Sequence, residues 1–226
     1  MSTQDRNISS ISIPRSLKLV GVIGGVWAIL LIVGAVIAYL PEHPGFSIFN
    51  TYLSDIGATP TWPQIIFNSC TLIAVPIRYL VLALLVMRLM QLGAGKSFAV
   101  ATLIVGFLST TGTALMTATP YTVSMTLNKT GIGLYFLGVI VLQTIIFIKE
   151  WSLRSVPKVL PVLSLLMVLL FLVFLAMFIL YEQGMVSRTA PVIWEWLSIL
   201  SSIVWILAQS ILLGRTDECQ QLTRYY

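Results

Sequence analysis

Six runs of about twenty apolar residues, separated by short polar breaks, constrain this chain more than any other feature of its sequence. The hydrocarbon core of a bilayer is roughly 30 Å thick, and an α-helix needs about twenty residues to cross it. We therefore predict an all-α fold, a polytopic transmembrane bundle of six helices. The helices are predicted near residues 17–40, 64–92, 98–118, 130–149, 159–181 and 191–213.

The composition agrees with a chain whose main solvent is lipid. Of its 226 residues 58% are hydrophobic and 9% are charged, too few polar side chains to cover a water-facing globule. No linker or internal repeat divides the sequence, so residues 1–226 are predicted to form one domain. The net charge of +5 comes from single basic residues beside apolar runs, a pattern that does not indicate nucleic-acid binding.

The basic residues also predict how the helices are oriented. Lys and Arg are enriched in the cytoplasmic loops of membrane proteins. The basic residues of the N-terminal segment, of alternate breaks and of the C-terminal segment are Arg6, Arg15, Lys18, Arg88, Lys96, Lys149, Arg154, Lys158, Arg215 and Arg224. The other three breaks contain only two Lys or Arg residues, Lys129 and Arg188. Both termini are therefore expected to be cytoplasmic, in an integral membrane protein whose membrane is not specified.

Small and polar residues recur on one side of four predicted helices. Such stripes face other helices, because small side chains let backbones approach and hydroxyls bond across the contact. The stripes comprise Gly21, Gly25, Ala28 and Ala35; Thr102, Gly106, Ser109, Thr113 and Thr117; Asn128, Gly131, Tyr135 and Gly138; and Glu195, Ser198, Ser202 and Gln209. The glycine side of the first helix suits either a homo-oligomer or packing within one chain.

Asp55 lies in the first outer break, in the sequence Ser54-Asp55-Ile56-Gly57. A carboxylate there can accept hydrogen bonds from nearby backbone amides, and Gly57 can adopt a positive φ. Asp55 either orders the loop or acts as a ligand or catalytic carboxylate. Glu195 lies near the outer end of the last helix. It either forms a structural hydrogen bond to this loop or belongs to a functional site with Asp55.

Arg78 lies well inside the second helix, on the same side as Asn68. A cation at this depth costs roughly 2.5–3.5 kcal/mol or more unless it is paired, extends to the headgroups or contacts water. Arg78 therefore either extends to the cytoplasmic headgroups or lines a polar cavity, where it can bind a lipid phosphate.

No cofactor and no metal site are expected from the sequence. His43 is the only histidine and has no ligand partner at helical spacing. A glycine-rich phosphate loop, paired cysteines and a Ser/His/Asp set are missing from the sequence as well.

Two segments resemble a known family. Residues 54–60, Ser-Asp-Ile-Gly-Ala-Thr-Pro, and residues 66–68, Ile-Phe-Asn, resemble the first-loop signature of the Frag/DRAM/Sfk family of six-helix membrane proteins. They are also similar to a large uncharacterised group of prokaryotic membrane proteins. Glu195-Trp196-Leu197 resembles a second family motif, whereas Asn128 and Lys129 stand where that family has a histidine and an acid. The resemblance implies six helices and roles linked to lipids, scaffolding and autophagy, with no shared reaction.

These observations favour a non-enzymatic protein that recognises a lipid or serves as a scaffold. Its predicted outward-facing polar site consists of Asp55, Glu195, Asn68 and Asn128, and its partners are membrane lipids, a protein or a second copy of the chain. The first alternative is a lipid-modifying enzyme in which Asp55 or Glu195 is the base and Arg78 binds phosphate. The second alternative is a small transporter or channel lined by Arg78 and the polar stripes.

Overall fold

The computed structural model of the chain describes residues 12–120 and 123–222, with side chains up to Arg215. Within this range it contains seven helices and no strand. They are α1 (Ile13–Tyr39), α2 (Leu53–Ala58), α3 (Trp62–Gln91), α4 (Lys96–Ala118), α5 (Met125–Ser152), α6 (Val159–Glu182) and α7 (Thr189–Leu222). All except α2 are long and apolar enough to span a membrane, so the prediction of an all-α protein with six spans is confirmed.

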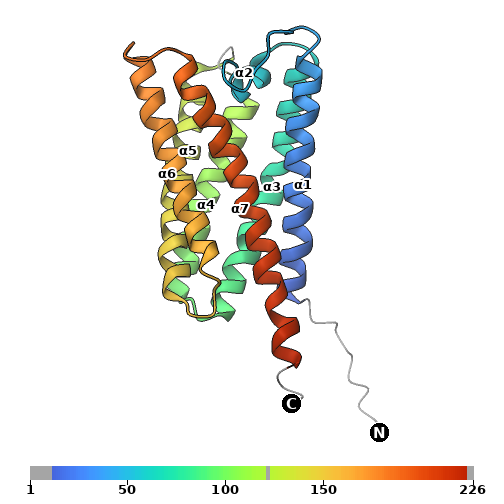
Figure 1. Ribbon diagram of the computed structural model, residues 1–226, viewed down its shortest axis with the longest axis vertical. Coiled ribbons are helices and arrows are strands. Elements are labelled where there is room, and N and C mark those ends of the chain that lie inside the picture. The colour runs from blue at the N-terminus through green and yellow to red at the C-terminus, as the bar shows by residue number, and fades with distance from the viewer. Residues whose placement is uncertain (1–11, 121–122, 223–226) are drawn as a thin grey trace.

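The spanning helices form a ring (Figure 1). Each helix packs against the next one in the chain, and α1 packs against α7, which closes the ring. Short connections between antiparallel helices favour such neighbour-to-neighbour packing. A ring of six helices leaves its central axis free of backbone, and α2 lies across one end of that axis.

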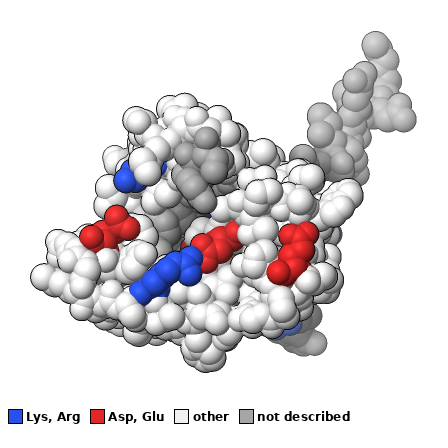
Figure 2. Space-filling view, turned by 90° about the horizontal axis from the view of Figure 1, so that it is seen from above, with Lys and Arg blue, Asp and Glu red and all other residues white. Residues whose placement is uncertain are grey.

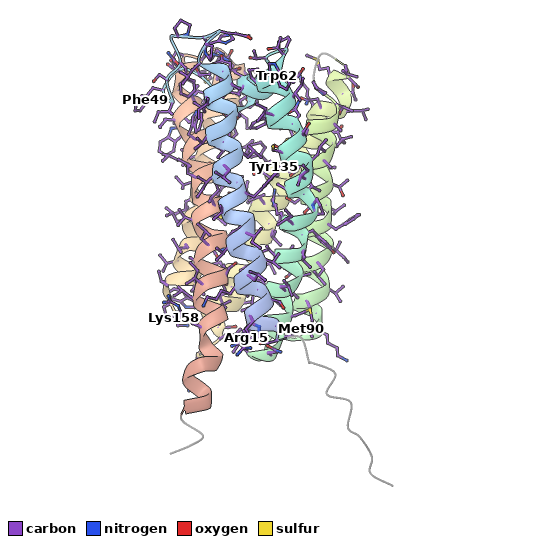
Figure 3. The ribbon with its side chains drawn as sticks, turned by 90° about the vertical axis from the view of Figure 1, so that its right-hand side faces the viewer. Arg15, Phe49, Trp62, Met90, Tyr135 and Lys158 are labelled. Atoms are coloured by element: carbon purple, nitrogen blue, oxygen red, sulfur yellow. The ribbon has the colours of Figure 1, made fainter. Side chains whose placement is uncertain are left out.

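The two ends of the ring differ in charge. Phe49 and Trp62 lie at the end that carries α2, whereas Arg15, Met90 and Lys158 lie at the opposite end (Figure 3). We name the end with α2 the outer end and the opposite end the inner end. The start of α1 and the end of α7 are both at the inner end. This arrangement agrees with the charge pattern, and the cytoplasmic location of that end stays a prediction.

Most of the buried side chains in the inner half of the ring are apolar. Leu85 and Leu89 of α3, Ile146 of α5, Leu160 of α6 and Leu213 of α7 are completely buried in one cluster. The cluster takes buried residues from all six spanning helices, so it packs across the ring at this level.

The glycines of the predicted stripes lie where two helices approach most closely. A Cβ added to Gly131 would be 2.6 Å from the amide nitrogen of Met116, and one added to Gly138 would be 2.7 Å from the Cβ of Ser109. On α1, a Cβ at Gly21 would collide with Ser210 of α7. The glycine side of the first helix is thus covered by α7 within the chain. Elsewhere in the ring, α4 and α5 approach each other closely enough for their backbones to be in contact.

We expect Gly131→Ala to destabilise the protein and Gly133→Ala, two residues away, to leave its stability unchanged or higher. The Gly131 methyl would press on backbone of α4, which cannot rotate away, and overpacking of this kind costs roughly 1–3 kcal/mol. An added Cβ at Gly133 meets no atom within 4 Å, so alanine there improves helix propensity by up to about 1 kcal/mol. Thermal unfolding in detergent measures both variants, and equal midpoints would contradict the close α4–α5 contact.

Candidate functional site

The axis of the ring contains a cavity of about 720 Å³. It lies beneath α2, its walls come from all six spanning helices, and the inner apolar cluster closes it below. Most of the wall is apolar, as Ile32, Val75, Phe136, Met167, Phe174 and Ile199 illustrate. A volume of this size is typical of a pocket that encloses a small molecule.

The cavity also reaches the lipid-facing surface. Leu137 of α5 is in its wall although 59% of that residue is exposed, and Phe178 of the neighbouring α6 is in the wall with 36% exposed. Gly133, one turn before Leu137, also lines the cavity. Two wall residues, one on α5 and one on α6, therefore also have surface exposed outside the bundle.

All five polar residues selected from the sequence border this one cavity. They are Asp55, Asn68, Arg78, Asn128 and Glu195, contributed by α2, α3, α5 and α7. Their sequence separation is large, and the ring brings them together. Four of them, Asp55, Asn68, Asn128 and Glu195, hold the outer end in place through their hydrogen bonds. The fifth, Arg78, faces the cavity.

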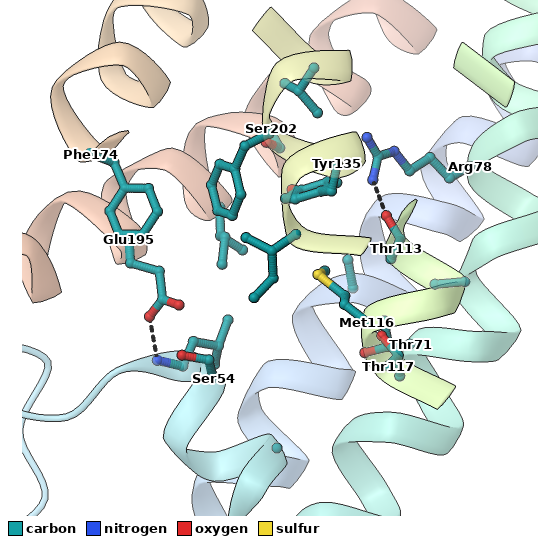
Figure 4. A pocket seen from close by; sticks show the side chains of 18 of the residues that line it. Ser54, Thr71, Arg78, Thr113, Met116, Thr117, Tyr135, Phe174, Glu195 and Ser202 are labelled. Atoms are coloured by element: carbon teal, nitrogen blue, oxygen red, sulfur yellow. Dashed lines mark hydrogen bonds between the residues drawn. The ribbon is translucent and has the colours of Figure 1, made fainter. Parts of the chain in front are cut away.

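Glu195 attaches α2 to α7. Its Oε2 accepts a hydrogen bond from the amide of Leu53 at 2.6 Å, and Ser54 lies beside the same carboxylate (Figure 4). The first amides of a helix have no partner within it, and a carboxylate at that end is also favoured by the helix dipole. Next to Glu195, the indole of Trp196 donates to the carbonyl oxygen of Thr51 at 2.9 Å. The start of α2 is thus fixed to the last helix.

Asp55 forms a second attachment through Arg188, which lies just before α7. One guanidinium nitrogen of Arg188 contacts both carboxylate oxygens, at 2.7 and 2.6 Å, and Asp55 Oδ2 also accepts from the amide of Tyr52 at 3.0 Å. Figure 2 shows this end from above, with acidic and basic side chains in contact across its middle. The prediction that Asp55 accepts a local backbone amide is confirmed.

Tyr52 completes this attachment. Its ring lies under the Arg188 guanidinium, 4.9 Å from centroid to carbon, and its hydroxyl donates to the Arg188 carbonyl at 3.1 Å. Burial raises the pKa of Tyr52 to about 12, so the phenol stays a protonated donor at neutral pH. The hydrogen bond from Arg188 to Asp55 raises the pKa of Arg188, which keeps the guanidinium charged.

On the opposite side, α2 is fixed to α3. The amide of Asn68 donates to the carbonyl oxygen of Gly57 at 3.2 Å. Gly57 does not adopt the positive φ that the sequence suggested; it is helical, and a Cβ there would lie 2.6 Å from the ring of Phe67. The glycine is needed for close approach of α2 to α3, not for a turn.

Asn128, near the start of α5, holds the end of α4. Its side-chain amide donates to the carbonyl oxygens of Met116 and Thr119, at 3.0 and 3.1 Å. These are among the last carbonyls of α4, which lack partners within their own helix. Asn128 thus borders the cavity, but its side-chain N–H groups are already bound to these backbone carbonyl oxygens.

Arg78 points into the cavity rather than toward the inner headgroups. Its Nη1 donates to the Thr113 hydroxyl at 3.2 Å and its Nη2 to the Ser109 hydroxyl at 3.3 Å, both on α4. The guanidinium also lies over the ring of Tyr135, 5.0 Å from the centroid. Figure 4 shows Arg78 and Glu195 on opposite sides of the cavity. Of the two sequence-based alternatives for Arg78, the structure has the cavity-lining one.

A buried polar cluster near the inner end was missed by sequence reasoning. Glu150, completely buried on α5, accepts from Gln209 of α7 at 2.6 Å and from Ser164 of α6 at 3.1 Å, and the Trp205 indole donates to Ser164 at 2.8 Å. The available signal was that Glu150 follows Gln143 by seven residues, two turns along the same helix side.

His43 packs on Tyr39, with ring centroids 4.0 Å apart. Within the described residues, no three His, Cys, Asp or Glu side chains come together in a group that could hold a metal ion.

Asp55→Asn and Arg188→Gln are each expected to speed hydrogen exchange of the amides of residues 52–58. The increase should reach about fivefold at most, because a partly exposed ion pair contributes about 1 kcal/mol or less. The double variant should exchange no faster than the single ones, since either substitution already removes the pair. Lys129→Gln, an exposed cation at the same end, is the control. Unchanged exchange in both variants would show that the pair does not hold α2.

The comparisons with known proteins leave the activity open. A model of a family described as "Protein of unknown function (DUF998)" matches residues 22–212, which include most of the ring. No curated protein and no solved structure matches the chain. None of these findings supports the resemblance to the Frag/DRAM/Sfk family.

Proposed function

The chain belongs to this DUF998 family of membrane proteins, and because the family description names no activity, we propose from the cavity that it binds an amphiphilic lipid inside its helix ring without altering it chemically. The observation that carries the proposal is a cavity of about 720 Å³ with a mainly apolar wall. An apolar chain that moves from the bilayer into the cavity replaces contacts with lipid by contacts with protein, which costs little free energy. Dispersion contacts with the wall can favour its binding.

Two further features support a lipid ligand. Leu137 and Phe178 belong to the cavity wall and are also exposed on the outside of the bundle, so we place the lipid entrance beside them, where a lipid would enter without crossing water. α2 covers the outer end and is held by Glu195 and by the pairing of its own Asp55 with Arg188, which gives these two carboxylates a role in keeping the cavity covered. The polar outer end thus supports the cavity instead of forming a separate headgroup site.

The enzyme alternative is less well supported. A general base needs a carboxylate that is available to accept a proton from the substrate. Asp55 is already bound to Arg188 and to the Tyr52 amide, and Glu195 accepts the Leu53 amide. A channel is also less well supported, because the buried cluster that includes Leu85 and Ile146 fills the axis toward the inner end.

Native mass spectrometry of the gently solubilised protein tests the proposal, with Gly133→Leu as the variant. Gly133 lines the cavity where an added side chain meets open space, so leucine should occupy part of the ligand volume while the protein remains folded. We expect the wild type to retain lipid and Gly133→Leu to retain severalfold less.

Val141→Leu, on the lipid-facing side of the same helix and outside the cavity wall, is the matched control and should retain lipid as the wild type does. If the wild type carries no lipid, or if both variants lose it equally, the cavity is not a lipid site.

A further inference from the structure

We infer that Arg78 is the anion-binding end of this cavity, and that the ligand is a single-chain amphiphile with an oxygen anion, a carboxylate or a phosphate, as its head. The inference rests on the proposed function and specifies the ligand of the same site. It is carried by an intramembrane guanidinium that faces the cavity and by the absence of a carboxylate beside it among the described residues.

The partners of Arg78 orient its guanidinium without neutralising it. The Thr113 and Ser109 hydroxyls accept its hydrogen bonds and donate their own protons to the carbonyl oxygens of Ser109 and Tyr135. A guanidinium has five N–H donors in a planar fork, so two bonds to hydroxyls leave others for a ligand. The ring of Tyr135 supports one side of the plane. The fork is thus held in place before a ligand arrives.

The charge of Arg78 needs a counterpart. Glu195 borders the same cavity, but Figure 4 shows it on the opposite side, where it is bound to the start of α2. Asp55 is paired with Arg188. A cation inside the membrane is costly when it is unpaired, and an oxygen anion bound to two guanidinium N–H groups compensates both charge and hydrogen bonding.

The rest of the cavity determines what the anion is attached to. Apolar side chains such as Val75, Phe136 and Met167 surround the space next to Arg78. A chain lying there is shielded from water while its charged end meets the guanidinium. The volume of about 720 Å³ suits one alkyl chain better than a two-chain phospholipid.

The test compares three probes that share one chain: hexadecanoate, hexadecyl phosphate and hexadecanol. Each is added at the same concentration to protein purified in neutral detergent, and the shift of the thermal unfolding midpoint and the retained ligand in native mass spectra are recorded. We expect the wild type to bind at least one of the two anions about tenfold more tightly than the alcohol. In Arg78→Met, binding of that anion should fall to the level of the alcohol.

Two more variants separate charge from structure. Arg78→Lys keeps the charge but loses the planar fork, and it should recover part of the preference for the anion. Lys96→Met removes an exposed cation at the inner start of α4 and should leave the preference unchanged.

The outcomes distinguish this inference from the proposed function. If the wild type binds the alcohol as tightly as both anions, or if Arg78→Met keeps the preference, the cavity binds lipid but Arg78 does not select its head. Acetate or inorganic phosphate could instead stabilise the protein as strongly as the chain-bearing anions do. That result would overturn the inference that the ligand is an amphiphile and would leave a site for small anions. If no chain-bearing probe binds, the proposed function itself fails.

Discussion

The contact between the first and last spanning helices is the interaction on which the rest of the structure depends. Without α1 against α7 the six helices would be an open row, because every other strong contact joins helices that are neighbours in the chain. The contact relies on Gly21, whose missing side chain leaves room for Ser210, and on Gly25, which does the same for Leu207. In lipid, close backbone approach takes the place of the hydrophobic effect in holding helices together. Because the ring is closed, the six spanning helices surround a central axis, and the cavity lies on that axis.

Much of the fold could be predicted from the sequence because the bilayer restricts the alternatives. Length and hydropathy define the six spans, and the stripe residues Gly131, Gly138 and Ser109 do lie between helices. Helix ends were less certain: α5 begins at Met125, before the predicted residue 130, and α7 continues to Leu222. Hydropathy does not register polar residues at an interface, and the additional turns begin and end there.

The candidate site was only partly predictable, since its geometry depends on pairs of residues far apart in the chain. α2 is six residues long, too short to be stable alone, and the bonds that order it come from Glu195 and Arg188, more than 130 positions later. The direction of Arg78 depends on hydroxyls of α4 that only the ring brings within reach. Glu150 likewise has no visible partner until α7 places Gln209 beside it.

The inner polar cluster has a mechanical consequence. Glu150, Ser164, Gln209 and Trp205 join α5, α6 and α7 by buried hydrogen bonds at one end of the bundle. At the other end, the start of α7 is held to α2 partly through the partly exposed ion pair of Arg188 with Asp55, which solvent ions screen. The bundle is therefore held more firmly at its inner end than at its outer end. On the proposed function, a bound lipid would then exchange with the bilayer or the outer side rather than through the inner end.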